Sequence, residues 1–215
     1  TVIPGGQTIV NFPFDPSGQM NQFVYVPNLH GNTAVKVRAD ACYNYQTKSS
    51  TKICVKEDLL SPTERLDVCE LSDVKDPQNS GAPIHITEVK EVPIGEQKIQ
   101  VTFKVEHIGE QTNTFFTHNT ECNDKITNPE KYFVYVDVIS DINGERADCS
   151  GLVAPAGEDR DGAFADGKQH AGFTRLFRGA SRIVSCTFDL AHIDSDFEEL
   201  FEVVLSYRYL TSIEK

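Results

Sequence analysis

The chain has 215 residues, with 20 basic and 32 acidic side chains and a formal net charge of −12. This charge argues against binding to nucleic acid or to an anionic membrane surface, because both partners need a basic footprint. The length suits two sandwich modules better than one. The sequence has no apolar run of about eighteen residues, so it predicts no membrane-spanning segment within the chain. The sequence begins at Thr1, and its single methionine is Met20, as expected of a processed or excised chain.

Residues 1–14 are rich in apolar side chains but are interrupted by Pro4 and Pro13. The simpler interpretation is an edge strand of the first module, because terminal strands usually pair within their own domain. The alternative is a strand donated to a neighbouring copy of the chain. The residues that would form such a donated strand are Ile9, Val10, Phe12 and Phe14.

Strand patterns dominate the first half of the chain. Residues 22–26 and 33–45 are rich in β-branched and aromatic side chains, and 51–56 continue the pattern. The polar residues 46–50 between them predict a turn, so a long hairpin is expected. Residues 68–74 predict one more short strand.

A cluster of turn-forming residues at 76–81 marks a predicted module boundary. After it, 84–92, 98–107 and 132–139 alternate between apolar and polar residues and predict strands. Asn143-Gly144 predicts a tight hairpin turn, with 145–149 pairing back. The inward-facing side chains expected on 98–107 are Ile99, Val101, Phe103 and Val105.

The C-terminal part is predicted to close the second module. Residues 151–172 form a long irregular stretch, and 183–188 and 201–210 predict strands. Residues 190–200 are compatible with a short helix or with a loop. The predicted fold is therefore all-β: two Ig-like β-sandwich modules in tandem, residues 1–80 and 81–215, stabilised by disulfides.

The chain has six cysteines without C-x-x-C spacing, which argues against zinc and thioredoxin-like sites. An even number of cysteines spread through β-rich sequence indicates an oxidising, extracellular or cell-surface environment. The alternative is six buried thiols in a cytosolic protein. The six residues are Cys42, Cys54, Cys69, Cys122, Cys149 and Cys186.

Six cysteines allow fifteen pairings. Cys42 and Cys54 are equally distant from Lys48, so the predicted hairpin would bring them opposite each other. Cys149 and Cys186 lie at or within strands of the second module and are expected to bridge its sheets. Because the boundary leaves three cysteines in each module, full oxidation within the chain requires at least one bridge across the boundary. The remaining pair, Cys69 and Cys122, is expected to supply it.

Several segments carry a family resemblance, namely FPFDPSGQ, VKVRADACYNYQTKSSTKICVKED, CELSDVKDPQNSGAPIHITEV, RIVSCTFDL and EVVLSYRYLTSIEK. They are similar to uncharacterised surface or membrane-anchored proteins of small-genome archaea. In that group a C-Y-x-Y-x-T hairpin with a second Cys precedes a third Cys and a Gly-Ala-Pro strand. The resemblance implies extracellular Ig-like modules that often follow a membrane anchor. It brings no catalytic residues.

The sequence contains no G-x-S-x-G, no H-E-x-x-H and no phosphate-binding glycine loop, so we expect a protein without enzymatic activity. No cofactor is expected. The alternative to a solvated acidic surface is a weak calcium site in the long loop, since extracellular modules often bind calcium through flexible loops. Its ligands would be Asp159, Asp161 and Asp166.

We therefore expect an extracellular structural protein, a subunit of a cell-surface layer or filament that forms homo-oligomers or polymers. N-terminal strand donation would join its copies. The alternative is an adhesin, a surface module that binds carbohydrate or protein through its loops.

Overall fold

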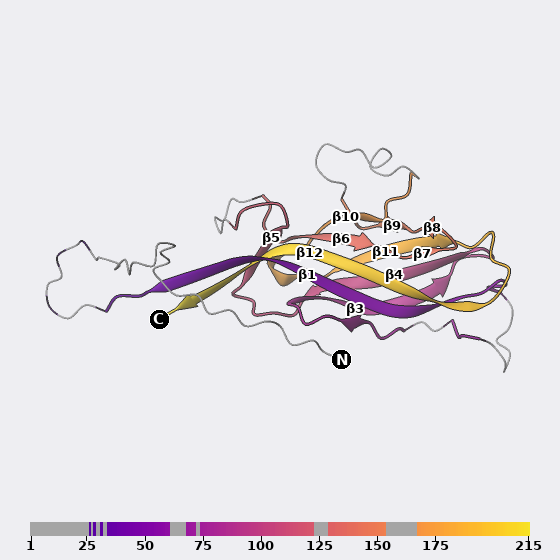
Figure 1. Cartoon of the computed structure of the whole chain (residues 1–215), viewed down its shortest axis with the longest axis horizontal. Coiled ribbons are helices and arrows are strands. Elements are labelled where there is room, and N and C mark those ends of the chain that lie inside the picture. The colour runs from indigo at the N-terminus through magenta and orange to yellow at the C-terminus, as the bar shows by residue number, and fades with distance from the viewer. Residues whose placement is uncertain are drawn as a thin grey trace, which may run out of the picture.

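The structure is a computed structural model that describes residues 26, 28, 31, 34–60, 68–71, 74–122, 129–153 and 167–215. Figure 1 shows an elongated molecule of layered strands, with one long two-stranded ribbon extending beyond the layers. The described helical structure is a single 3₁₀ turn, η1. The elements are β1 Arg38–Val55, β2 Gln78–Asn79, β3 Ile84–Pro93, β4 Lys98–His107, β5 Thr114–Thr117, β6 Phe133–Val138, β7 Asp141–Ile142, β8 Glu145–Arg146, β9 Asp148–Ser150, β10 Ala171–Arg175, η1 Phe177–Gly179, β11 Arg182–Asp189 and β12 Phe197–Glu214.

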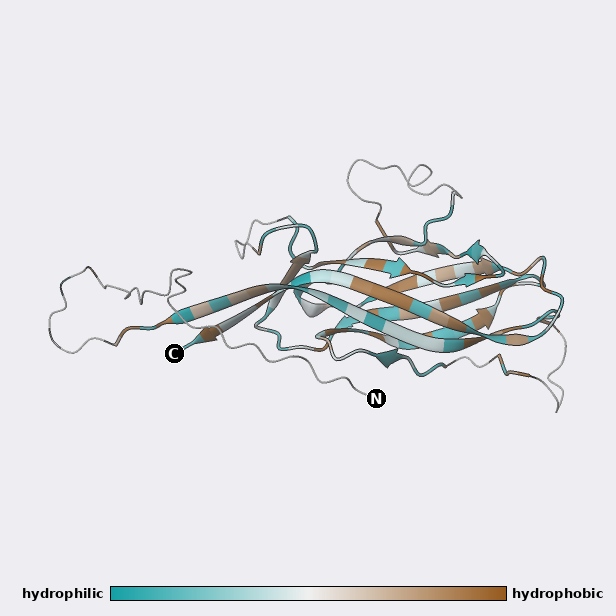
Figure 2. Ribbon diagram, in the orientation of Figure 1, coloured by the Kyte–Doolittle hydropathy of each residue, from teal (hydrophilic) through white to brown (hydrophobic). Residues whose placement is uncertain are grey.

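Two sheets form a sandwich, which confirms the predicted all-β class. The larger sheet has the order β10-β6-β12-β1-β2, with β5 also paired to β12, and the smaller has the order β3-β4-β11-β9. Side chains from both sheets meet in one core: the ring centre of Phe103 on β4 lies 5.8 Å from that of Phe201 on β12. Figure 2 shows hydrophobic and hydrophilic residues alternating along the strands, as expected when one face is buried.

The first and last strands pair with each other at the centre of the larger sheet. β1 and β12 are antiparallel along their whole 18-residue lengths, from Arg38 opposite Glu214 to Val55 opposite Phe197. One buried cluster contains residues of both strands. The predicted modules 1–80 and 81–215 therefore do not appear as separate cores in the described part of the chain. Strand pairing across residue 80 joins them into one sandwich.

The predicted hairpin at residues 46–50 is wrong, because β1 runs straight through them. Thr47, Ser49 and Thr51 are buried, whereas Lys48 and Lys52 are exposed, so the segment keeps the period of two of a half-buried strand. Residues 46–50 contain none of the Gly, Pro, Asn or Asp residues that make turns favourable. Polarity alone was a misleading turn signal.

Local patterns were more reliable after residue 80. The strands predicted at 84–92, 98–107, 132–139 and 183–188 correspond to β3, β4, β6 and β11. The tight turn is confirmed: Asn143 and Gly144 have φ of +52° and +80° and join β7 to β8. The four side chains predicted to face inward from β4 are buried, namely Ile99, Val101, Phe103 and Val105.

Other local assignments differ. The structure has no helix at residues 190–200, where β12 already begins at Phe197. Residues 148–150 form β9 and pair with β11 instead of extending the β7–β8 hairpin. The strand predicted at 68–74 is absent from the described residues there, and β5 and β10 were not predicted.

A buried polar network ties the two sheets together. Thr47 of β1 donates a hydrogen bond from Oγ1 to the carbonyl of Ile84 on β3 at 2.8 Å. The backbone N–H of Ile84 donates to the Tyr207 hydroxyl of β12 at 3.3 Å, and that hydroxyl lies 3.1 Å from Thr47 Oγ1. Thr47 and Tyr207 are both fully buried, so water cannot replace these bonds.

We predict that Thr47→Val, which keeps the side-chain shape, lowers the free energy of unfolding by about 1–3 kcal/mol. The buried Ile84 carbonyl would lose its donor. Urea unfolding monitored by tyrosine fluorescence measures the change. Thr211→Val is the matched control, because Thr211 bonds Tyr43 at an exposed position, and it should change stability by less than about 0.5 kcal/mol. Equal stability of Thr47→Val and the wild-type chain would contradict this role.

Candidate functional site

The assembly and calcium predictions concern residues outside the described part of the chain, so both stay predictions. Those residues are Ile9, Val10, Phe12, Phe14, Asp159, Asp161 and Asp166. Within the described ranges, no group of three or more His, Cys, Asp or Glu side chains is arranged to hold a metal ion.

All six cysteines form disulfides, and two of the predicted pairings are wrong. Cys42 and Cys54 both lie on β1, about 40 Å apart at ~3.3 Å per residue, far beyond the reach of a disulfide. Cys69 and Cys122 each take one of these as partner. The pairing of Cys149 with Cys186 is present, but it joins directly opposite positions on neighbouring strands of one sheet and does not link two sheets. The bridges are Cys42–Cys122, Cys54–Cys69 and Cys149–Cys186.

The most prominent surface feature is the projecting ribbon (Figure 1). We define it as two paired segments: residues 37–44, which are the start of β1 and the residue before it, and residues 208–215 at the end of β12. One face of the ribbon is apolar. On it Val37 is 65%, Ile213 66% and Tyr43 41% exposed. Beyond Leu210, the last residue of β12 that pairs with β5, the ribbon has two strands, and a two-stranded ribbon without a covering layer is only marginally stable in water. An exposed apolar stripe of this kind is typical of an interaction surface.

The opposite face of the ribbon is polar and internally paired. Arg38 Nε lies 2.7 Å from Asp40 Oδ1, and Ser212 donates to the same oxygen at 2.6 Å. Arg208 Nε donates to Asn44 Oδ1 at 2.8 Å. Because these polar groups satisfy one another across the two strands, the polar face holds the ribbon together. The apolar face then remains for contact with another surface.

The outer edge of β1 is the second feature of the ribbon. Val37 exchanges backbone hydrogen bonds with Lys215, so odd-numbered residues of β1 bond to β12 and even-numbered residues point away from it. Lys48 follows this rule, because its carbonyl accepts from the N–H of Ser80 on the outer side. Among the described strands, β1 has an outer partner only at Ser49 and Ser50. The edge from Ala39 to Gln46 has no strand partner within the described residues.

The base of the ribbon is firmly anchored. The rings of Tyr45 and Tyr207 stack at 5.7 Å, and Tyr43 packs against Tyr209 at 6.1 Å. The disulfide of Cys42 ties β1 at this level to residue 122. Burial raises the pKa of both the Tyr207 and Tyr209 hydroxyls above the ordinary value of 10, so they remain protonated. The ribbon thus leaves the sandwich in a fixed direction.

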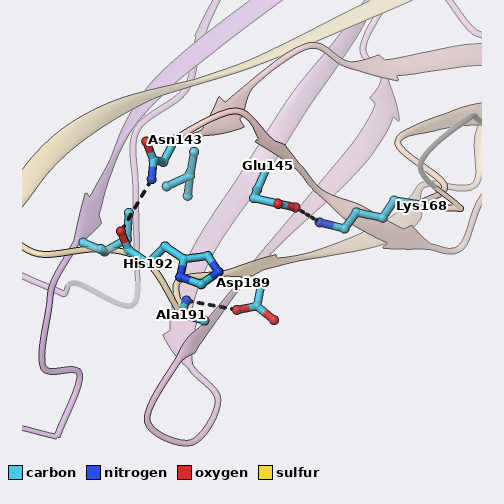
Figure 3. A pocket seen from close by; sticks show the side chains of 8 residues that line it. Asn143, Glu145, Lys168, Asp189, Ala191 and His192 are labelled. Atoms are coloured by element: carbon cyan, nitrogen blue, oxygen red, sulfur yellow. Dashed lines mark hydrogen bonds and ion pairs between the residues drawn. The ribbon is translucent and has the colours of Figure 1, made fainter.

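The hollows on the described surface include one of about 330 Å³ at the ribbon, lined by Arg38, Thr112, Thr114, Leu210, Ser212 and Glu214, and two beside the sandwich. Of these two, the first, of about 240 Å³, lies beside the β7–β8 turn (Figure 3). Its polar groups mostly bond one another: Glu145 pairs with Lys168, and Asp189 Oδ1 accepts from the N–H of Ala191 at 3.0 Å. The second, of about 360 Å³, is lined by His107, Gln111, Asn113, Phe115, Tyr132, Arg178 and Gly179.

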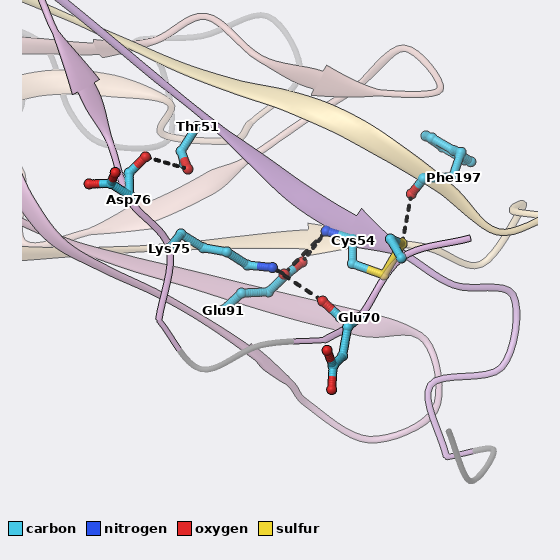
Figure 4. A network of polar contacts seen from close by, with 8 residues as sticks. Thr51, Cys54, Glu70, Lys75, Asp76, Glu91 and Phe197 are labelled. Atoms are coloured by element: carbon cyan, nitrogen blue, oxygen red, sulfur yellow. Dashed lines mark hydrogen bonds and ion pairs between the residues drawn. A yellow bond between two sulfur atoms is a disulfide. The ribbon is translucent and has the colours of Figure 1, made fainter. Parts of the chain in front are cut away.

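A buried ion pair closes one side of the sandwich (Figure 4). Glu91 of β3 is fully buried; one carboxylate oxygen lies 2.7 Å from Lys75 Nζ, and both oxygens accept from the N–H of Cys54, at 2.9 and 3.1 Å. Lys75 also donates to the Glu70 carbonyl at 3.3 Å. Burial raises the pKa of Glu91 above 4.5, while Lys75 and the Cys54 N–H oppose the rise. The network links the edges of both sheets beside the Cys54–Cys69 bridge.

Sequence reasoning did not predict the ribbon or the second hollow. The composition of residues 33–45 predicts a strand, but the turn predicted at 46–50 ends that strand too early, because β1 continues for 18 residues. Arg178 was not singled out. One signal was available: residues 167–188 contain four basic side chains and no Asp or Glu, in a chain with an acidic excess. Those basic residues are Lys168, Arg175, Arg178 and Arg182.

Comparisons with known proteins give little guidance. No protein-family model and no curated protein matches this sequence. A solved structure of envelope protein VP37 from White Spot Syndrome Virus aligns with 79% of this chain and 98% of that chain, at 9% identity and a TM-score of 0.29. The resemblance to archaeal surface proteins stays a prediction. In the described residues no helix is long and apolar enough to cross a membrane.

We predict that Glu91→Gln lowers the free energy of unfolding by about 3–5 kcal/mol at neutral pH, because Lys75 loses its buried counter-charge. Adding Lys75→Met should restore most of the loss, since the Gln carbonyl still accepts from Cys54. The exposed pair Lys52–Glu198, at 2.6 Å, is the control: Glu198→Gln should cost less than about 1 kcal/mol. Chemical unfolding of the four chains measures this. A double variant no more stable than Glu91→Gln alone would contradict the assignment.

A pH dependence follows from three partly buried histidines. Burial lowers the pKa of His85, His107 and His118 below 6.5. Below pH 6.5 the unfolded chain therefore binds more protons at these sites than the folded chain, and stability decreases as the pH falls. Glu91, whose pKa is raised, acts in the opposite direction. We compare each variant with the wild-type chain, because the Glu91 contribution then cancels.

We predict that His118→Gln reduces the loss of stability between about pH 7.5 and pH 5.5, because one depressed pKa is removed. His118 stacks on Phe173 at 6.0 Å. His192→Gln, at an exposed position, should leave the pH dependence unchanged. Unfolding midpoints at several pH values measure both. Identical pH profiles for His118→Gln and the wild-type chain would disprove the assignment.

Proposed function

We propose that the chain is a non-enzymatic extracellular structural protein, a subunit of a cell-surface layer or filament. Its copies join by adding a donated N-terminal strand to the outer edge of β1. The observation that carries the proposal is the projecting ribbon. It combines an apolar face with a β1 edge that lacks strand partners among the described residues.

Three disulfides support an extracellular location. All six cysteines are oxidised, and the bridges lie in the ribbon base, the closed side of the sandwich and the smaller sheet. Bridges of this kind persist outside the cytoplasm, where thiols are not kept reduced. A subunit of a surface assembly also has to stay folded without intracellular chaperones, and cross-links that constrain the unfolded chain help with that.

The chemistry of strand addition supports a second copy as the partner. The outward backbone groups of Asp40, Cys42, Asn44 and Gln46 offer a ladder of donors and acceptors, which an added strand satisfies regardless of its sequence. Alternate side chains of that strand then determine specificity. The residues that the sequence analysis assigns to donation, Ile9, Val10, Phe12 and Phe14, lie outside the described part of the chain and are apolar enough to accompany the apolar face.

A second candidate function is an adhesin or surface binding module. The observation that favours it is the second hollow, which gathers an arginine, two amide side chains and aromatic rings beside the sandwich. Such a combination of apolar wall and converging polar groups is typical of a small-ligand site. Assembly and binding use different surfaces, so one chain can perform both.

We predict that two variants distinguish the donor strand, residues 1–14, from the acceptor edge on β1, because each variant removes one of them and keeps the other. Deleting residues 1–14 removes the donated strand. Asn44→Pro blocks the β1 edge and keeps every backbone hydrogen bond to β12, because the Asn44 N–H points outward; it removes only the exposed side-chain bond from Arg208 Nε. Sedimentation velocity and negative-stain microscopy should show concentration-dependent polymers for the wild-type chain and monomers for each variant. Thermal unfolding midpoints check that both variants fold.

A mixture of the two variants provides the decisive test. The Asn44→Pro chain still has a donor strand and the deleted chain still has an acceptor edge, so together they should form a one-to-one complex that does not grow. Ser212→Pro, which blocks the outer edge of β12 on the same ribbon, is the matched control and should still polymerise. A monomeric wild-type chain at every concentration, or polymers unchanged by deletion, would falsify strand donation.

A further inference from the structure

The second hollow is built from four separate parts of the chain. His107 ends β4, Phe115 lies on β5, Tyr132 precedes β6, and Arg178 with Gly179 belongs to η1. Its volume of about 360 Å³ falls at the lower end of the range for small-ligand sites. Phe115 is fully buried and Tyr132 partly buried, and their rings meet edge to face at 5.6 Å. They give the hollow an apolar wall.

Backbone strain is concentrated at this hollow. Four described residues other than glycine have positive φ: Glu88, Tyr132, Asn143 and Arg178. Two have local explanations, since Asn143 forms a tight turn and Glu88 lies at a register shift between β3 and β4. The other two, Tyr132 at +69° and Arg178 at +53°, both line the hollow. Strained residues of this kind tend to cluster at functional sites.

Hydrogen bonds hold the two strained residues in place. The backbone N–H of Tyr132 donates to Phe115 O, and Leu176 donates to Tyr132 O, both at 2.8 Å. Gly179 donates to Leu176 O at 3.1 Å and closes the turn that carries Arg178. The surrounding structure therefore fixes two side chains beside the hollow, which a relaxed loop would place elsewhere.

Positive charge accumulates at the same place. The guanidinium groups of Arg175 and Arg178 lie against the ring of Phe177, at 5.4 and 5.3 Å from its centre. Arg182 Nε donates to the carbonyl of Arg175 at 3.0 Å. Among the described residues, none of the three arginines pairs with a carboxylate. Arg178 lines the hollow, whereas Arg175 and Arg182 lie outside its lining. In a chain of net charge −12, three neighbouring arginines that pair with no carboxylate among the described residues give this region a local positive charge that attracts anions.

We infer that this hollow binds the anionic group of an acidic saccharide, a sugar ring that carries a carboxylate or a sulfate. Arg178 would bind the anion through its fork of N–H donors. The amides of Gln111 and Asn113 would bond hydroxyls, and the Tyr132 ring would contact the apolar face of the sugar. The inference names a ligand class for the surface-binding function proposed above and rests on it. It does not depend on assembly.

A sugar fits the observations better than an acidic peptide does. An extended peptide would need an open groove with several spaced cations, whereas the hollow is confined and has one arginine in its lining. The other lining polar groups at neutral pH are uncharged amides and His107, whose Nε2 lies 3.0 Å from the Tyr209 hydroxyl. Neutral donors and acceptors beside one cation complement a ring with several hydroxyls and one negative charge.

Calorimetric titration of the whole oxidised chain tests the inference. The probes are 3′-sialyllactose for a carboxylate, a sulfated disaccharide, lactose as the neutral sugar, a hexaglutamate peptide and inorganic phosphate. We expect at least one acidic saccharide to bind about tenfold or more tightly than lactose, the peptide or phosphate. Which one does so identifies the source of the anion. Equal affinity for lactose, or tighter binding of the peptide or of phosphate, overturns the inference.

Arg178→Gly separates binding from folding. Glycine adopts φ of +53° without strain, so the thermal midpoint should not fall, while affinity for the acidic saccharide should decrease about tenfold or more. Arg178→Lys keeps the charge but loses the fork and should also weaken binding. Arg208→Gln removes one charge on the ribbon, where Arg208 bonds Asn44, and should leave affinity within about twofold.

Arg178→Gly and Arg208→Gln losing affinity equally would show general electrostatic attraction and would exclude this site. Acidic-saccharide binding that survives Arg178→Gly would keep the surface-binding function but place its ligand elsewhere. If the wild-type chain binds no saccharide at millimolar concentration, both the proposed site and the surface-binding function are wrong. These outcomes separate failure of the site from failure of the function.

Discussion

The architecture depends on the antiparallel pairing of β1 with β12, which joins distant parts of the chain along 18 positions. The outer side of β12 carries β5 and β6, β6 carries β10, and β1 carries β2, so the other four strands of the larger sheet attach to this ladder directly or through a neighbour. The ladder is also longer than the sandwich. Its inner half alternates between buried and exposed residues, whereas residues 38–46 of β1 are exposed or only partly buried. The ribbon is the part of the ladder against which the second sheet does not pack.

The second sheet packs on the first through the shared apolar core and through buried polar bonds. Thr47 and Tyr207 bond the backbone of β3 inside the core. At the open side, the segment that contains Lys75 bridges to Val89 of β3, and β2 then pairs with β1. The Cys54–Cys69 bridge fixes the start of this segment. A sandwich has open sides wherever its two sheets end, and here a disulfide and a buried ion pair close one of them.

Sequence patterns predicted the structure well where it depends on neighbours along the chain, and poorly where it depends on distant partners. The strict alternation of apolar and polar residues predicts β4 and its buried face. The Asn143-Gly144 pair predicts the turn between β7 and β8 by conformational preference alone. Residues 46–50 fit a turn or a strand equally by polarity, and only β12 decides between them. The disulfides of Cys42 and Cys54 then followed from the wrong choice. The strain at Tyr132 and Arg178 could not be predicted, because neither residue type favours positive φ.

The two proposed surfaces meet at one residue, Tyr209. Its ring packs at 6.1 Å against Tyr43 of the apolar ribbon face, and its hydroxyl lies 3.0 Å from His107 Nε2 in the lining of the hollow. Two sites influence each other only where a ligand binds two states of the connecting structure with different affinity. Tyr209 is 3% exposed, contacts a second ring cluster at Tyr207, and lies one residue from the position that faces Cys42. Such a connection is held in one geometry by packing, hydrogen bonding and a nearby disulfide. The fold therefore favours additive action: the hollow keeps its shape whether or not the ribbon is occupied, and an assembly would present many copies of the hollow at fixed spacing. Weak individual binding then becomes strong attachment through multivalency.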